Sequence, residues 1–204
     1  MPKPSLSLAT EFIRRTNILE VSRTKMETLF ASGNIAQTDI DQVYAGLFLN
    51  TFTEFEALIE DLFLGFLMGV LYSKTYTIVK RVRIKPVSLT QEIVFHGRPY
   101  LDWLPYEKFT LPRAKRYFVN GEPFEQLDDA HKKSLLEYHM IRNAIAHKSD
   151  SAQKKFQKII NGLTLLPHEK TPAGYLRSKP RGTGQTQYEI IVIELEVIAK
   201  KLCA

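Results

Sequence analysis

The fold is decided by residues 39–66, which read DIDQVYAGLFLNTFTEFEALIEDLFLGF. Large apolar side chains recur in this segment at steps of three and four residues. They are Tyr44, Phe48, Phe52, Phe55, Ile59, Phe63 and Phe66. This spacing places them on one face of an α-helix of about six turns, and Asp39 or Asp41 suits its N-terminal end. The sequence therefore predicts a long helix that forms the spine of the core.

Three more helices are predicted on either side of this segment. Residues 5–29 contain no Gly or Pro, and their apolar residues recur at helical spacing. Residues 127–147 contain no helix breaker and open with acidic residues, which suit the positive end of a helix. Residues 188–202 form a final apolar helix, although their Ile and Val content leaves a buried strand as the alternative.

A shorter helix is predicted over residues 150–160, where Gln153 is placed to complete a capping box from Asp150. Another is predicted over 111–118, with Pro112 in its first turn, where a missing N–H does no harm. Together these patterns predict an all-α bundle of about five to seven helices.

The segment 73–124 differs from the rest because it is basic and is interrupted by Pro residues, which forbid long helices. These are Pro86, Pro99, Pro105, Pro112 and Pro123. Residues 75–85 are rich in Thr, Val, Ile and Tyr, so a small β-hairpin with 91–95 or an irregular insertion is expected around residues 74–97. The length of 204 residues favours a single domain, 1–204, that includes 73–124 as an insertion-like segment.

The composition excludes several classes of protein. With 44% hydrophobic and 25% charged residues, the chain is that of a globular protein and not of a disordered tail. Its one cysteine, Cys203, excludes an intramolecular disulfide framework and a Cys-rich zinc site. The apolar run at 62–72 is shorter than the roughly 18 residues that a membrane span requires, and no secretory signal is visible. We therefore expect a cytoplasmic protein without a membrane partner.

The charge favours a polyanionic partner. The formal net charge is +6, and basic residues cluster at 80–85, 113–116 and 177–181. We expect Lys80, Arg81, Arg83 and Lys148 to bind RNA; the alternative is that such residues only solubilise the surface. Walker, dinucleotide, zinc-protease and nucleophile-elbow motifs do not occur, so neither a cofactor nor a metal is expected.

The candidate site lies at residues 142–147, which read RNAIAH. Asn143 and His147 are four residues apart, so on a helix they share a face, and the amide can hold the imidazole in one orientation. Arg142 offers a planar donor pair to a phosphate, and the helix end favours the imidazolium of His147. Arg and His near one phosphate suit RNA cleavage without a metal. The alternative is that Arg142 pairs with a helix carboxylate and His147 bonds the last carbonyls of its helix.

These residues resemble the R-x4-6-H signature of the HEPN superfamily of all-helical domains. Four blocks of the chain are similar to blocks of its RiboL-PSP-HEPN-like group. They are FTEFEALIEDLF at 52–63, RAKRYFVNGEPF at 113–124, IRNAIAHKSD at 141–150 and PAGYLRS at 172–178.

The resemblance implies a HEPN-like helical bundle and a metal-independent endoribonuclease of toxin–antitoxin or phage-defence systems. It assigns Arg142 and His147 as the catalytic pair and Asn143 as a polar helper. Glu56 matches an acidic position that positions Arg142 or stabilises the bundle; an ordinary surface carboxylate is the alternative. An antitoxin or another defence-system protein is then a further partner.

A homodimer is expected because each chain holds one such motif. Cleavage needs a base and an acid on opposite sides of the phosphorus, and one imidazole cannot take both places. Leu136, Met140 and Ala144 would supply an apolar contact surface between two copies. The alternative function is a non-catalytic HEPN module that binds RNA, a nucleotide or a protein partner.

Overall fold

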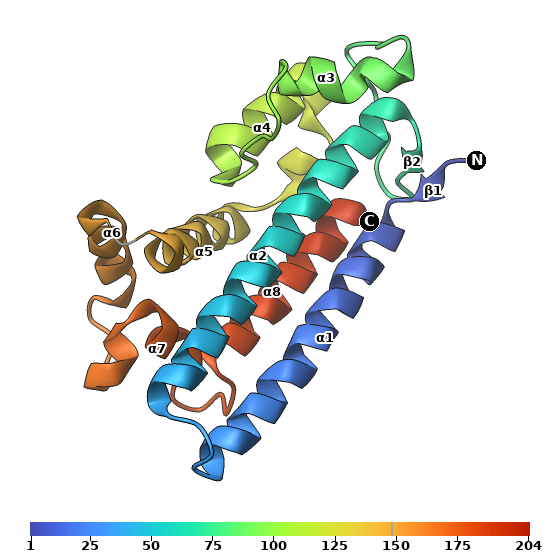
Figure 1. Cartoon of the computed structure of the whole chain (residues 1–204). Coiled ribbons are helices and arrows are strands. Elements are labelled where there is room, and N and C mark those ends of the chain that lie inside the picture. The colour runs from blue at the N-terminus through green and yellow to red at the C-terminus, as the bar shows by residue number, and fades with distance from the viewer. Residues whose placement is uncertain (148) are drawn as a thin grey trace. The chain divides into compact units, whose positions relative to one another are not determined.

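In a computed structural model, which describes residues 1–147 and 149–204, the chain is all-α apart from one short strand pair (Figure 1). The α-helices are α1 Leu6–Ala31, α2 Gln37–Met68, α3 Thr90–Phe95, α4 Tyr106–Tyr117, α5 Asp129–Ala146, α6 Asp150–Ile160, α7 Pro172–Arg177 and α8 Gln187–Cys203. The strands β1 Lys3–Pro4 and β2 Leu71–Tyr72 pair in parallel. The predicted all-α class is therefore confirmed.

The chain forms two compact units. The first unit consists of residues 1–12, 55–136 and 196–204, and the second unit consists of residues 13–54 and 137–195. Because α1, α2, α5 and α8 are long, each of them contributes residues to both units. The insertion-like segment 73–124 lies within the first unit, and the candidate motif 142–147 lies within the second.

The core of the first unit is built around Phe63 on α2. Its ring lies 5.1 Å from the ring of Trp103, 5.1 Å from Phe118, 5.7 Å from Tyr117 and 5.7 Å from Phe124. All five side chains are buried. Segment 73–124 is therefore packed against α2 through its aromatic residues, which fill the core at the C-terminal part of that helix.

Residues 73–86 hold no helix or named strand, so the irregular alternative describes this segment and the expected hairpin is wrong. Residues 91–95 are helical, within α3. An isolated antiparallel bridge instead joins Lys80 to Phe118, supported by hydrogen bonds from Arg81 N to Tyr117 O and from Val119 N to Val79 O, both 2.8 Å. Residues 79–81 thus pair with residues 117–119, at the end of α4. The alternation of apolar and polar residues within 75–85 could not predict this distant partner.

Helix α4 begins earlier than predicted. It starts at Tyr106, so Pro112 lies inside the helix and not in its first turn. Pro105 occupies the N-cap position, and the buried hydroxyl of Tyr106 donates to Phe124 O at 2.8 Å. Tertiary contacts of Tyr106 and Leu111, both buried, offset the hydrogen bond that an internal proline removes.

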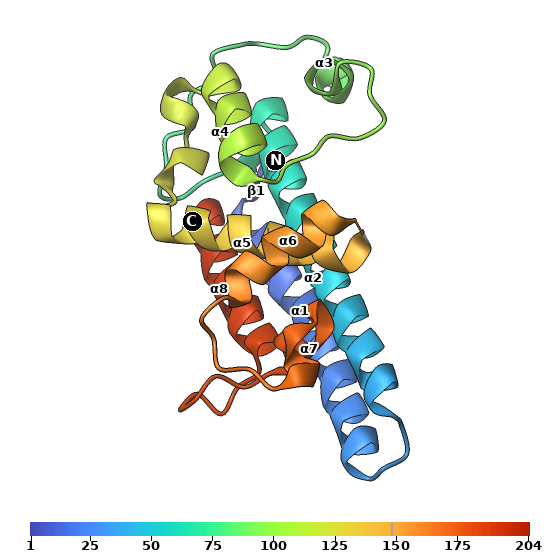
Figure 2. The ribbon, with the colours of Figure 1, turned by 90° about the vertical axis from the view of Figure 1, so that its left-hand side faces the viewer.

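In the second unit, residues of α1, α2 and α8 lie side by side (Figures 1 and 2). The Tyr44 and Tyr188 rings meet edge to face at 5.9 Å, and the Thr51 and Tyr188 hydroxyls share a buried hydrogen bond of 3.0 Å. Burial raises the pKa of Tyr188 to about 12. Residues 187–203 are helical, so the strand alternative for this segment is wrong.

Helix α7 is not among the helices predicted from the sequence. Thr171 is its N-cap and accepts a hydrogen bond from Gly174 N at 3.0 Å, while Pro172 occupies the first helical turn. Tyr175 and Leu176 are buried, and the Tyr175 ring meets that of Phe156 on α6 at 5.9 Å. Packing therefore stabilises a helix too short to be stable alone.

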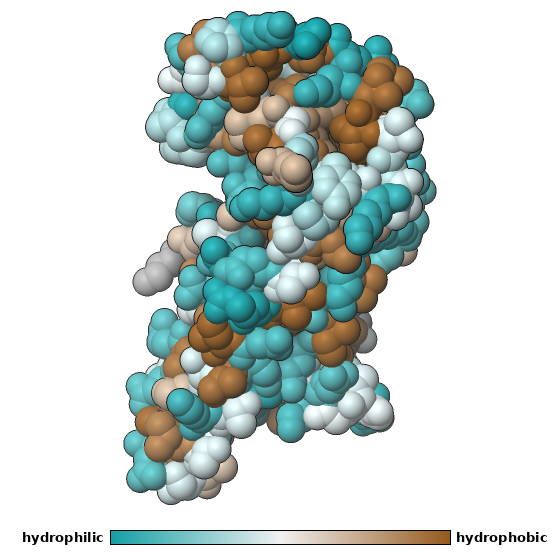
Figure 3. Space-filling view, turned by 90° about the vertical axis from the view of Figure 1, so that its right-hand side faces the viewer, coloured by the Kyte–Doolittle hydropathy of each residue, from teal (hydrophilic) through white to brown (hydrophobic). Residues whose placement is uncertain are grey.

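Exposed apolar side chains on α1 include Ile18, Val21 and Leu29. Figure 3, which faces the side on which α1 lies, shows hydrophobic groups separated by hydrophilic ones.

Across 1–147 and 149–204, none of the helices combines the length and the apolarity needed to cross a bilayer.

Candidate functional site

The predicted site residues lie at the C-terminal end of α5. Arg142 and Asn143 are half-buried in this helix, which ends at Ala146, and His147 follows immediately and is exposed. The backbone N–H of His147 donates to Asn143 O at 2.9 Å. The imidazole of His147 is therefore accessible to solvent, whereas the Arg142 side chain is partly covered by the rest of the second unit.

A chain of hydrogen bonds joins three side chains of α5. Arg142 Nη1 donates to Asn143 Oδ1 at 3.2 Å, and Asn143 Nδ2 lies 2.8 Å from His139 Nε2. An amide nitrogen can only donate, so Nε2 accepts in this arrangement. A flipped amide would turn its donor toward the Arg142 donor, so the contact with Arg142 fixes the orientation of the amide.

The amide of Asn143 thus faces His139, one turn earlier, and not His147 as the sequence reasoning expected. The His139 ring lies 6.3 Å from the ring of Phe52 on α2. On a helix, Asn143 can reach the side chains four residues before and after it, which are His139 and His147, but His147 lies beyond the last helical residue. Asn143 is therefore placed to orient Arg142.

Hydrogen bonds hold the end of α5 and the start of α6. Ser149 is the N-cap of α6, and its hydroxyl accepts from Ala152 N at 3.4 Å. Gln153 Nε2 donates to Ala144 O at 2.9 Å and so satisfies a carbonyl near the end of α5. The predicted capping box from Asp150 is therefore wrong, because Gln153 reaches back to the preceding helix.

Two other predicted groups lie elsewhere. Glu56 is half-buried on α2 in the first unit, and its role stays a prediction. Met140 is half-buried, as is Leu136, whereas Ala144 is 4% exposed and thus offers little surface to a second copy. The prediction that Ala144 contacts a second copy is therefore wrong, because its side chain is buried within its own chain.

The predicted RNA-binding residues of the first unit differ in their surroundings. Lys80 Nζ donates to Leu67 O at 3.1 Å, and Arg81 Nε donates to Phe118 O at 3.1 Å. Both side chains therefore fasten the irregular segment to its neighbours. Arg83 is exposed. Lys148 lies outside the described residues.

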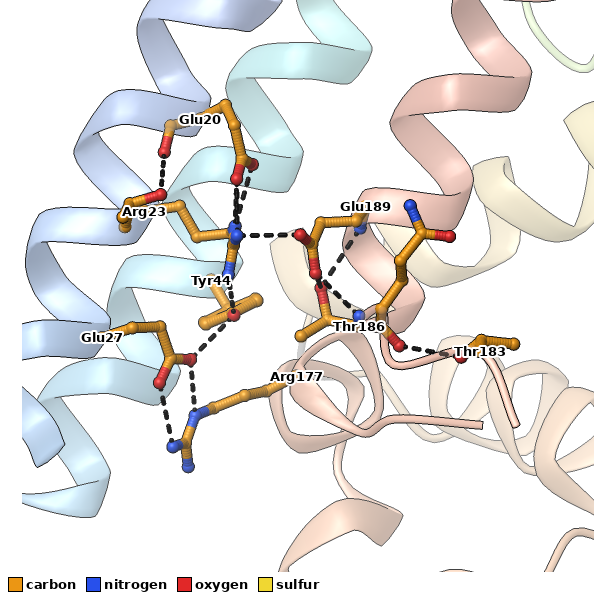
Figure 4. A network of polar contacts seen from close by, with 10 residues as sticks. Glu20, Arg23, Glu27, Tyr44, Arg177, Thr183, Thr186 and Glu189 are labelled. Carbon is orange, nitrogen blue, oxygen red and sulfur yellow. Dashed lines mark hydrogen bonds and ion pairs between the residues drawn. The ribbon is translucent and has the colours of Figure 1, made fainter. Parts of the chain in front are cut away.

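A polar network that the sequence reasoning missed lies in the second unit (Figure 4). Arg23, whose side chain is 11% exposed, donates to Glu20, to Glu189 Oε1 at 2.8 Å and to the Tyr44 hydroxyl at 3.2 Å. The Tyr44 hydroxyl donates to Glu27 Oε1 at 2.8 Å. No sequence motif marks these residues, because they come from three helices, α1, α2 and α8.

The network continues to α7, where Arg177 Nε donates to Glu27 Oε1 at 3.0 Å. Burial alone would raise the pKa of Glu27, but its hydrogen bonds to Arg177 and Tyr44 hold that pKa below the ordinary value of 4.5. Glu27, Arg177, Gln37 and His168 line an adjoining cavity of about 300 Å³. Because its charges are paired with one another, we interpret the network as stabilising and not as catalytic.

Within the described ranges, no three or more His, Cys, Asp or Glu residues gather as metal ligands would. Comparisons with family models, with curated proteins and with solved structures find no match to the chain. The arrangement at the end of α5 therefore has to be interpreted from its own chemistry. It combines an exposed imidazole with a guanidinium whose orientation is set by a neighbouring amide.

Proposed function

We propose that this protein is a metal-independent endoribonuclease of the HEPN type, with a role in a toxin–antitoxin or phage-defence system. The observation that carries the proposal is the exposed imidazole of His147 directly after α5, five residues from an Arg142 guanidinium that Asn143 orients. An imidazole titrates near neutral pH and can move a proton, while a guanidinium stabilises charge on a phosphate.

The reaction is a transesterification. His147 accepts the proton of the ribose 2′-hydroxyl while the 2′-oxygen attacks phosphorus. Arg142 stabilises the negative charge of the pentacovalent phosphate. The bond to the 5′-oxygen then breaks, and that oxygen takes a proton from an acid, which leaves a 2′,3′-cyclic phosphate and a 5′-hydroxyl.

The acid is the His147 of a second copy. Two imidazoles lie on α5, those of His131 and His139, and the nearer one, His139, lies eight residues before His147, a rise of about 12 Å along a helix. Its Nε2 is also bonded to Asn143 Nδ2. A two-fold dimer instead brings two His147 side chains to one phosphodiester.

RNA digestion in EDTA tests this proposal. The wild type is incubated with single-stranded RNA beside His147→Ala and Arg142→Ala, and the product ends are analysed. Because an acid or a base typically contributes 10²–10⁴-fold, we expect His147→Ala to slow cleavage by at least about 10²-fold. His168→Ala is the matched control, since His168 is an exposed imidazole of the same unit outside the motif.

Co-expression of wild type with His147→Ala tests the shared site. If both imidazoles act on one bond, activity falls with the square of the wild-type fraction; if each chain acts alone, it falls in proportion to that fraction. Undiminished cleavage by His147→Ala would refute the nuclease proposal. RNA binding by the wild type without any cleavage would instead favour the non-catalytic module.

A further inference from the structure

The positive charge of the chain is concentrated in one segment of the first unit. Residues 73–118 contain ten Lys and Arg against three Asp and Glu, a formal charge of +7, whereas the whole chain carries +6. All other residues together are therefore close to neutral. Solubility alone would favour charges of both signs over the whole surface, so this separation calls for a local explanation.

Arg113 and Arg116 lie three residues apart on α4, and Arg113 contacts Asp102 and Trp103 of the loop that also holds Arg98. Burial lowers the pKa of Arg113, and the positive charges of Arg116 and Arg98 lower it further, while Asp102 and Tyr117 oppose this change. Arg116 lies on α4 with Arg113, but Arg98 comes from the loop after α3. Positive charges of two separate elements thus act on Arg113, and a bound anion would offset their repulsion.

Arg113 is held rigidly at this place. Its guanidinium lies 4.6 Å above the ring of buried Trp103, and Nη1 donates to Asp102 O at 3.0 Å. Arg98 and Arg116 are exposed and form no ion pair with any described residue, whereas the adjacent Lys115 pairs with Glu125 at 3.1 Å. Two guanidiniums are therefore available to a ligand beside a third that is fixed.

An exposed aromatic ring accompanies the cluster. Tyr100 follows Arg98 by two residues and is 72% exposed, so its ring makes little contact with the rest of the protein. Surfaces that bind single-stranded nucleic acid combine cationic groups along the backbone with aromatic rings on which bases stack. The segment 98–116 offers both groups.

We propose that Arg98, Arg113, Arg116 and Tyr100 form a binding site for single-stranded RNA, in which the guanidiniums contact phosphates and the Tyr100 ring stacks on a base. This proposal rests on the proposed function only for the choice of RNA as the nucleic acid. It moves the expected RNA contact away from Lys80 and Arg81, whose side chains already bond to backbone carbonyls.

Fluorescence anisotropy with a labelled oligouridine tests the site in EDTA at several salt concentrations. The His147→Ala background prevents cleavage, so binding is measured alone. For single strands the logarithm of affinity falls with the logarithm of salt by about 0.7 for each phosphate contact. We expect R98Q/R116Q to reduce this slope by about 1.4, because it removes two contacts.

A matched variant, K25Q/K133Q, removes the same charge from exposed lysines outside the segment and should keep the slope of the background protein. Tyr100→Ala should weaken binding about fivefold or more, and Tyr100→Phe, which retains the ring, should restore it. Circular dichroism checks that each variant is folded.

The outcomes separate this proposal from the nuclease. If R98Q/R116Q binds with an unchanged slope, or if the protein binds phosphatidylserine vesicles but not RNA, the site proposed here is wrong. If the slope falls as expected while the wild type never cleaves RNA, the binding site stands and the nuclease proposal fails.

Discussion

Replacing Phe63 by alanine tests whether segment 73–124 is a packed part of the first unit. The Phe63 side chain is fully buried, and four aromatic rings from this segment surround it, at centroid distances from 5.1 to 5.7 Å. The substitution removes the ring but leaves the backbone of α2 unchanged. Its effect on stability therefore measures how tightly the segment packs on this helix.

The expected loss follows from this packing. A buried Phe replaced by Ala costs about 3–5 kcal/mol of the free energy of unfolding. Aromatic pairs at these distances add about 0.5–1.5 kcal/mol beyond the area buried, so four partners place Phe63 in the upper half of that range, at about 4–5 kcal/mol. At about 2–4 °C per kcal/mol for a chain of this length, Tm should fall by about 8–20 °C.

The single tryptophan supplies the assay. Trp103 is 2% exposed, and its ring lies 5.1 Å from that of Phe63, so its emission reports unfolding at this place. Urea unfolding is followed by Trp103 fluorescence and by far-ultraviolet circular dichroism. Phe63→Leu, which keeps most of the apolar volume but loses the ring pairs, should cost less than Phe63→Ala.

Phe156→Ala supplies the comparison in the second unit. Phe156 is also fully buried, but it has one close ring partner, Tyr175, at 5.9 Å. We expect this variant to lose about 3 kcal/mol, near the lower end of the range for buried phenylalanines. The reasoning is refuted if Phe63→Ala unfolds at the wild-type urea concentration with unchanged Trp103 emission, because the segment would then not pack on α2.

Two further predictions concern the second unit. Asn143→Ala should lower kcat for RNA cleavage by about 10²-fold with little change in KM or Tm, because Arg142 loses the acceptor that orients it; an equal loss of folded protein would indicate a structural role instead. Because the folded pKa of Glu27 is depressed, its bond to Arg177 stabilises the fold above pH about 4.5 and is lost as pH falls below that value. Urea unfolding across this pH range should show a smaller acid destabilisation for Glu27→Gln than for wild type, and identical profiles would contradict the prediction.

The helices could be predicted because their causes are local. The apolar spacing over residues 39–66 lies within α2, and all of the predicted 5–29 except Ser5 lies within α1. The acidic residues near 128 begin α5 as expected, with Asp128 Oδ1 accepting from His131 N at 3.0 Å. Side chains three and four residues apart meet on a helix whatever the rest of the chain does. The motif 142–147 was found for the same reason, since its residues are neighbours in sequence.

What the sequence by itself determined is therefore the all-α class, the long helices and the position of one Arg and one His at a helix end. Only the tertiary structure decided that the Asn143 amide faces His139, that residues 79–81 pair with the chain after α4, and that Arg113 lies over the ring of Trp103. The last two depend on groups brought together from separate elements, which a sequence pattern does not record, whereas Asn143 had a partner on each side along its own chain and the packed structure selected one.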